Sequence, residues 1–233
     1  MKSRERVLTA LNHEEPDRVP VDCGGRQTTF MVDSYKNVKT HLGLKDLPTK
    51  MMSHKWQTVY VDEQILERFG IDCRHVRPPM IAEPELLESA AGEILFVADL
   101  VQFVRELTPA RIYFHSCGAF AALLDDLIDI GVEILNPVQV TATGMETEKL
   151  KKRYGKQLSF WGAIDTTVVL PNGTAADVKK EVAKRIRDLG PGGGYVLGSV
   201  HNMQNDIPPQ NILAMFEAAA QFGKYPLNAY VND

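Results

Sequence analysis

Hydrophobic and polar positions along the second half of the chain alternate between a strand-like and a helix-like period. Short apolar runs that predict buried strands lie at 111–115, 132–135, 158–161 and 195–198. Amphipathic stretches that predict helices lie at 119–130, 146–154, 174–189 and 208–222. Repeated β–α units of this kind predict an α/β protein with a parallel sheet, either doubly wound or closed into a barrel.

The first half of the chain has a less regular pattern. Ser3 is placed to cap a short helix whose apolar face is Val7, Leu8 and Leu11. Further helices are expected near 33–42, 62–69 and 83–107, with a weak point at Gly92, and short strands at 18–22 and 71–76. The whole chain then has about six strands, whereas a closed (β/α)₈ barrel needs eight.

Composition narrows the class of protein. The 233 residues suffice for one domain, 1–233, and 44% hydrophobic with 24% charged residues is ordinary for a globular protein. A net charge of −4 gives no support for nucleic-acid binding, and no apolar stretch approaches membrane-spanning length. The N-terminus lacks the apolar core of a signal peptide, and three scattered cysteines do not form a disulfide framework. We therefore expect a cytoplasmic protein.

The first candidate for chemistry is the pair His115 and Cys117, at the end of the strand predicted over 111–115. Residues two apart in a strand point the same way, so both side chains share one face at its C-terminal end. The positive end of the following helix favours a thiolate at Cys117. An imidazole beside a thiolate suits zinc. A buried cysteine beside a hydrogen-bonded histidine is the alternative.

Other polar residues follow the remaining strands. His201 suits a metal ligand or a proton donor, and Asp165 suits a substrate contact or a contact to a ligand histidine; we expect both to be catalytic. Gln139, Trp161 and Arg26 are the expected substrate-binding residues. The alternatives are a solvated loop histidine, a turn aspartate, an amide that satisfies backbone groups and a surface arginine.

Several segments together resemble the uroporphyrinogen decarboxylase (URO-D)-like superfamily, in particular its branch of corrinoid-linked methyltransferases. They fall in family order and cover roughly residues 1–78 and 95–222. The matching segments are Arg4–Leu11 with Pro16–Val21, His115–Gly118, Gly131–Gln139, Phe160–Asp165, and His201–Gln204 through Pro208–Ile212.

The resemblance implies a TIM barrel with its pocket at the C-terminal strand ends. In the methyltransferases a His-x-Cys pair and a later cysteine hold zinc; His115 and Cys117 match the pair, and His201 replaces the later cysteine. The implied activity is zinc-dependent transfer of a methyl group between a corrinoid (cobalamin) protein and a thiol or tetrahydrofolate acceptor.

The decarboxylases of the superfamily imply a different activity, porphyrinogen decarboxylation without a cofactor. They use an arginine-rich first loop and an aspartate near the second strand. This chain keeps Arg26 but lacks the second arginine of that loop, and Asp72 is near the aspartate's place. His201 matches a histidine that the decarboxylases also keep, so it does not separate the two activities.

The chain is short for this family. The family's middle strands have no counterpart between about 79 and 95, so we expect a barrel that lacks about two middle β/α units, with a junction near 79–95. An incomplete barrel exposes sheet edges, which a second copy of the chain could cover in a homo-oligomer. A third hypothesis is therefore a shortened, non-catalytic member that acts by binding a corrinoid protein or another chain.

Overall fold

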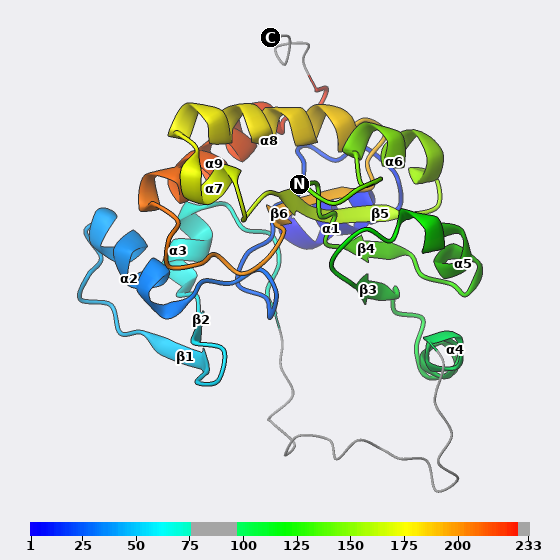
Figure 1. The fold of residues 1–233 in the computed structure, drawn as a ribbon, viewed down its shortest axis with the longest axis horizontal. Helices are drawn as coiled ribbons and strands as arrows, with labels where there is room; N and C mark the ends of the chain where they lie inside the picture. Colours follow the sequence, from blue (N-terminus) through cyan, green and yellow to red (C-terminus); the bar gives the residue numbers. More distant parts are fainter. Residues whose placement is uncertain (76–96, 228–233) are drawn as a thin grey trace, which may run out of the picture.

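The computed structural model describes residues 1–75 and 97–227 and centres on a four-stranded parallel sheet (Figure 1). The strands lie in the order β3 (Tyr113–His115), β4 (Ile134–Asn136), β5 (Ser159–Ile164) and β6 (Tyr195–Ser199). All three neighbouring pairs are parallel. The predicted α/β class with a parallel sheet is thus confirmed.

The sheet continues beyond β6 through two segments of the first half. Val21 pairs in parallel with Leu197, and Asp22 N donates to Leu197 O at 2.8 Å. Asp72 N in turn donates to Val21 O at 2.8 Å. The strand predicted at 18–22 is therefore present only as isolated bridges at Arg18 and Val21. The strand predicted at 71–76 is present only as the hydrogen bond from Asp72, and residue 76 lies outside the described residues.

The described residues do not form a closed (β/α)₈ barrel, and the α/β class with a parallel sheet is the part of the expected barrel fold that they show. Four parallel strands, with one segment joined by a bridge and one by a hydrogen bond, are too few to bring the sheet back on itself, because a (β/α)₈ barrel closes with eight strands. Residues 79–95, where two units were expected to be missing, lie outside the described part, and their loss stays a prediction.

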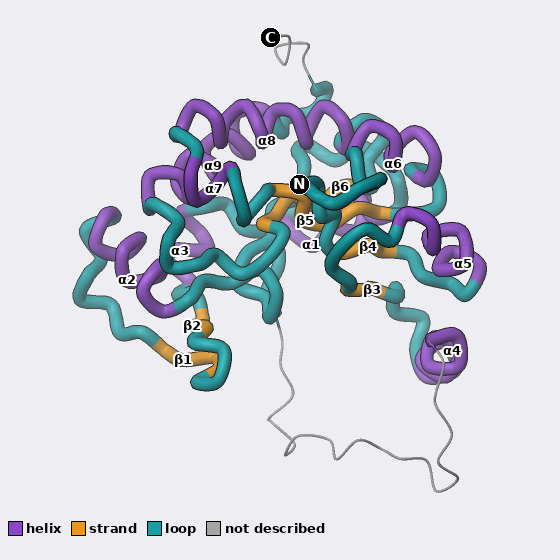
Figure 2. Tube along the Cα trace, in the orientation of Figure 1, coloured by secondary structure: helices purple, strands orange, loops and turns teal. Residues whose placement is uncertain are grey.

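Helices lie around the sheet, as Figure 2 shows. They are α1 (Ser3–Leu11), α2 (Val32–His41), α3 (Glu63–Arg68), α4 (Val97–Leu107), α5 (Leu124–Asp129, after a 3₁₀ turn at Ala121–Leu123), α6 (Thr147–Tyr154), α7 (Val169–Asn172), α8 (Ala175–Leu189) and α9 (Pro209–Phe222). Ser3 is the first residue of α1 and not its cap, which is Lys2. The predicted helix over 83–107 is described only from residue 97, as α4.

Side chains alternate between the two faces of the sheet. We call the face packed against α8 the outer face and the face packed against α1 the inner face. On the outer face, Phe160 and Leu197 join the main core with the buried stripe of α8, which includes Val182 and Ile186. On the inner face, Ile134, Trp161 and Val196 form a separate cluster with Leu11 of α1. This is the alternation that a strand imposes, and it leaves the inner face to carry the polar groups described below.

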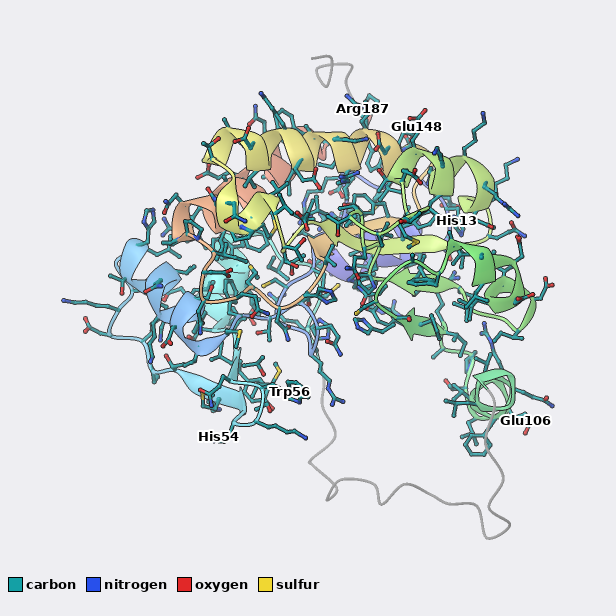
Figure 3. All side chains as sticks on the ribbon, in the orientation of Figure 1. His13, His54, Trp56, Glu106, Glu148 and Arg187 are labelled. Carbon is teal, nitrogen blue, oxygen red and sulfur yellow. The ribbon has the colours of Figure 1, made fainter. Side chains whose placement is uncertain are left out.

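An antiparallel hairpin, which the sequence pattern did not predict, joins α2 to α3. It consists of β1 (Lys50–Ser53) and β2 (Thr58–Tyr60). Figure 3 shows its tip, with His54 and Trp56, on one side of the molecule and α4, with Glu106, on the other. Among the described residues, no helix is long and apolar enough to cross a membrane.

Candidate functional site

The C-terminal strand ends bring one thiol and two imidazoles together. His115 ends β3, Cys117 follows it, and His201 lies two residues after β6. Cys117 Sγ lies 3.7 Å from His115 Nε2 and 3.9 Å from His201 Nδ1. The thiol is exposed and both histidines are half-buried. The three side chains predicted as metal ligands therefore lie together at this end of the sheet.

The loop that carries His201 is fixed by backbone contacts. Val200 N donates to Ile164 O at 2.8 Å, which ties the loop to the end of β5. Thr29 N donates to Asn202 Oδ1 at 3.0 Å, and Met203 N donates to Thr29 O at 2.8 Å. The first loop of the chain thus holds His201 beside Cys117, although 84 residues separate the two in sequence.

Sulfur and nitrogen at these separations suit zinc. Tetrahedral zinc with Zn–S of about 2.3 Å and Zn–N of about 2.0–2.1 Å places its ligand atoms about 3.5 Å apart, and the two observed distances are close to this. As placed, however, the described residues contain no group of three or more His, Cys, Asp or Glu side chains that could hold a metal ion. Binding of zinc therefore requires these side chains to adjust.

The surroundings of His201 favour a neutral imidazole, the form that can bind a metal ion. Burial lowers the pKa of its imidazole, and the neighbouring His115 lowers it further. A histidine must be unprotonated to bind a metal. The environment of His201 therefore favours the form that a metal site needs.

His115 has a partner on its other ring nitrogen. His115 and Asn136 occupy the same rung of the β3–β4 pair. His115 Nδ1 lies 2.6 Å from Asn136 Oδ1, and Asn136 Nδ2 donates to Trp161 O at 3.2 Å. Asn136 is fully buried. The Asn136 side chain thus holds His115 through Nδ1, while Nε2 of the same ring faces Cys117.

The oxygen of Gln139 contacts the loop after the cysteine. Its Oε1 accepts a hydrogen bond from Gly118 N at 2.7 Å. Gly118 has φ of +100°, a conformation that favours glycine. Gln139 therefore fixes the turn that carries Cys117, and its expected contact with substrate stays a prediction.

Asp165 serves the turn that follows β5. Its carboxylate accepts hydrogen bonds from Thr167 N, Thr167 Oγ1, Val168 N and Val169 N at 2.7–3.0 Å. Burial by itself raises the pKa of this carboxyl, but these bonds outweigh it and hold the pKa below its usual range. Asp165 thus lies in the turn-forming arrangement that was the alternative to catalysis.

Trp161 points into the inner face and contacts a carboxylate that sequence reasoning missed. Trp161 Nε1 donates to Asp22 Oδ2 at 3.0 Å, and the Tyr113 ring packs edge-on against the indole at 5.4 Å between centroids. His75 Nε2 lies 3.0 Å from Asp22 Oδ1. Asp22 and His75 lie near the C-terminal ends of adjacent strand-like segments, which is the one sequence signal that could have paired them.

The two residues expected near an acidic substrate lie in different settings. Arg26 is exposed in the first loop, and it forms no ion pair with the residues that the structure describes. Asp72 is buried, and its carboxylate accepts hydrogen bonds from Arg6, from Arg18 at 2.7 Å and from Val21 N at 3.0 Å. Asp72 is therefore already paired within the fold.

Comparison with known proteins places the chain in a family. A family model described as uroporphyrinogen decarboxylase (URO-D) matches residues 93–222, more than half of the chain. A solved methyltransferase from Methanosarcina mazei is similar at 21% identity and a TM-score of 0.44, over 55% of this chain and 36% of that chain. The match thus spans about a third of that protein's length. No curated protein matches. The chain belongs to the uroporphyrinogen decarboxylase (URO-D) family.

Proposed function

We propose that this chain is a zinc-dependent methyltransferase of the URO-D family. It would move a methyl group between a corrinoid protein and a thiol or tetrahydrofolate acceptor. The observation that carries the proposal is the meeting of Cys117 Sγ with one nitrogen each of His115 and His201 at the strand ends. Family membership supports it.

The three proposed metal ligands determine what chemistry the site can perform. His115, Cys117 and His201 would hold the metal, and a tetrahedral zinc with three protein ligands keeps a fourth position for substrate. Zinc bound there lowers the pKa of an incoming thiol and so supplies a nucleophile at neutral pH. The exposure of Cys117 leaves that side of the site open to an acceptor and to a corrinoid carried by a partner protein.

Metal content tests the ligand set directly. Protein purified without chelator is expected to contain about one zinc per chain, and Cys117→Ala is expected to lose most of it. Cys73→Ala is the matched control, because burial, together with nearby Asp22, raises the pKa of the Cys73 thiol and keeps it protonated. Zinc-free wild type, or equal zinc in Cys117→Ala, would falsify the proposal.

Activity is measured with free methylcobalamin as the methyl donor and a small thiol as the acceptor. Loss of the methylcobalamin absorbance should require Cys117 and His201. Retention of turnover in His201→Ala with unchanged zinc would remove His201 from the site and leave the other two ligands.

Porphyrinogen decarboxylation has less support in the structure. Two arginines and a backbone amide engage the Asp72 carboxylate, so it is not free to contact a pyrrole. Arg26 is a single cation, whereas a substrate with several carboxylates calls for several. If the wild type binds porphyrin and Arg26→Ala does not, porphyrinogen decarboxylation becomes the better-supported function.

A further inference from the structure

We propose that Asn136 is a positioning residue that fixes the tautomer of His115 and thereby turns the bare Nε2 of that imidazole toward Cys117. The inference concerns the protein without any ligand. Its consequence for metal binding rests on the proposed function.

The position of Asn136 is set by the sheet. It is the last residue of β4, it is fully buried, and it faces His115 across the β3–β4 pair. Its backbone oxygen also accepts a hydrogen bond from Ser116 N at 2.9 Å. The Asn136 side chain therefore has little freedom to move away from the imidazole.

The orientation of the amide follows from its second partner. Asn136 Nδ2 lies 3.2 Å from the backbone oxygen of Trp161. A carbonyl oxygen only accepts hydrogen bonds, so the NH₂ end of the amide must face Trp161. The oxygen end must then face His115, because a flipped amide would bury its oxygen against the Trp161 oxygen, with two acceptors in contact.

The tautomer of the imidazole follows in the same way. Asn136 Oδ1 only accepts, so at 2.6 Å the Nδ1 of His115 must carry the proton. In a neutral imidazole the other nitrogen then has a free lone pair. That nitrogen, Nε2, is the one 3.7 Å from Cys117 Sγ.

The amide of Asn136 fixes the tautomer of His115 without adding charge. A carboxylate in the same place would also accept from Nδ1–H, but it would bury a negative charge beside the site and favour the imidazolium. The neutral Asn136 orients His115 without placing a charge beside it. Groups that orient a metal-binding histidine in this way commonly contribute a factor of about 10 to 100 in metal affinity.

The test reads the tautomer in the metal-free protein. Long-range ¹⁵N–¹H correlation on ¹⁵N-histidine-labelled protein, at a pH where imidazoles are neutral, is expected to show His115 protonated at Nδ1. In Asn136→Leu, which keeps the approximate shape but has no acceptor, the Nδ1–H form should lose its dominance. Asn136→Asp, which keeps the acceptor, should keep Nδ1 protonated.

Zinc affinity is the second measurement, by competition with a chromophoric chelator. Asn136→Leu is expected to bind zinc about 10 to 100 times more weakly than wild type. Asn211→Leu is the matched control, because Asn211 is also a buried asparagine, with its amide on Leu170 O and Gly173 O. It should lose stability while keeping the His115 tautomer and the zinc affinity.

The outcomes separate this inference from the proposed function. An Nε2–H tautomer in wild type overturns the inference without any variant, and so does an unchanged tautomer in a folded Asn136→Leu. If wild type binds no zinc but the tautomer depends on Asn136, the zinc proposal fails and the positioning role stands. Circular dichroism of each variant verifies folding, and if Asn136→Leu does not fold, the wild-type spectrum alone decides.

Discussion

Asp22 is a buried carboxylate that accepts three hydrogen bonds from side chains. The donors are Thr28 Oγ1 at 2.9 Å, Trp161 Nε1 at 3.0 Å and the imidazole of His75 at 3.0 Å. A buried carboxylate is costly unless such partners replace water. Asp22 therefore joins the first loop, β5 and the segment after residue 71 into one unit on the inner face.

Gly25 makes the His75 contact sterically possible. A Cβ at this position would lie 2.3 Å from His75 Cε1 and 2.5 Å from His75 Nε2. Gly25→Ala should therefore push the ring away from Asp22 and lower the free energy of unfolding by about 1–2 kcal/mol.

A double-mutant cycle measured by urea unfolding tests this steric relation. In a His75→Ala background the cost of Gly25→Ala should fall by at least about 0.5 kcal/mol, because the clashing ring is gone. Equal costs in the two backgrounds would show that the glycine serves some other purpose.

At this scale the sequence predicted which three side chains lie together, but it did not predict the groups that support them. His115, Cys117 and His201 could be proposed because each lies at or just after the end of a recognisable strand. The pairing of Asp22 with His75 joins residues 53 apart and depends on how the first loop folds over the sheet. The partners of Asp165 lie within four residues, yet turn and site aspartates look alike in sequence.

The helix α8 shows how much a well-marked element can be predicted. The predicted range of 174–189 agrees with the observed Ala175–Leu189, because the apolar stripe and the capping pattern point to the same boundaries. Thr174 Oγ1 accepts from Asp177 N at 3.2 Å, and Asp177 Oδ2 accepts from Thr174 N at 3.0 Å. Local and tertiary preferences agree here.

Removal of this cap should be measurable. Thr174→Ala is expected to lower the free energy of unfolding by about 1 kcal/mol, because it leaves an N–H at the start of α8 without its side-chain acceptor. Ser3→Ala is the matched control at another helix start, where Ser3 is already inside the helix and exposed. Denaturant unfolding should show a much smaller change for Ser3→Ala; similar losses in both would contradict the capping argument.

Shorter elements were beyond the sequence pattern. The hairpin β1–β2 has strands of four and three residues and an irregular register between Met51 and Ser53, so it lacks the regular alternation that identifies a strand. Conversely, the apolar run at 18–22 predicts a full strand, yet only Val21 forms a bridge to β6. In both cases tertiary contacts decide the pairing.

At the scale of the whole molecule, an ionic network links the N-terminus to the sheet. Arg6 contacts both Asp17 and the buried Asp72, and Arg18 also contacts Asp72. The hydrogen bond from Arg6 is the largest influence on Asp17 and holds the pKa of its carboxyl well below the usual value. The network thus ties α1 to the segments at 17–18 and 72.

This network predicts a loss of stability in acid. A carboxyl whose pKa is lower in the folded than in the unfolded state contributes stability that is fully present above the unfolded pKa and is lost as the pH falls toward the folded pKa. For Asp17 the loss should begin near pH 3.8, its ordinary value, and continue below it. Urea unfolding of wild type and Asp17→Asn should differ at pH 7, and the difference should shrink below pH 4. A constant difference across this range would rule out the linkage.

The architecture of the complete molecule was predictable only in part. The parallel sheet followed from the β–α alternation, but its closure depends on how many strands the chain supplies, which local pattern cannot determine. Among the described residues, β3 has β4 as its single strand neighbour. Loss of two middle units, and a second copy of the chain covering the exposed edge, both stay predictions.

The rung shared by His115 and Asn136 has a consequence for folding fidelity. Successive residues of a strand face opposite sides, so a slip of β3 by one residue would turn His115 outward and bring Phe114, which now packs near Phe120, to the inner face. β3 is only three residues long, so few backbone hydrogen bonds, among them Ser116 N to Asn136 O at 2.9 Å, hold its alignment with β4. The protonated nitrogen of one histidine is therefore a spectroscopic reporter of whether the sheet has assembled in register.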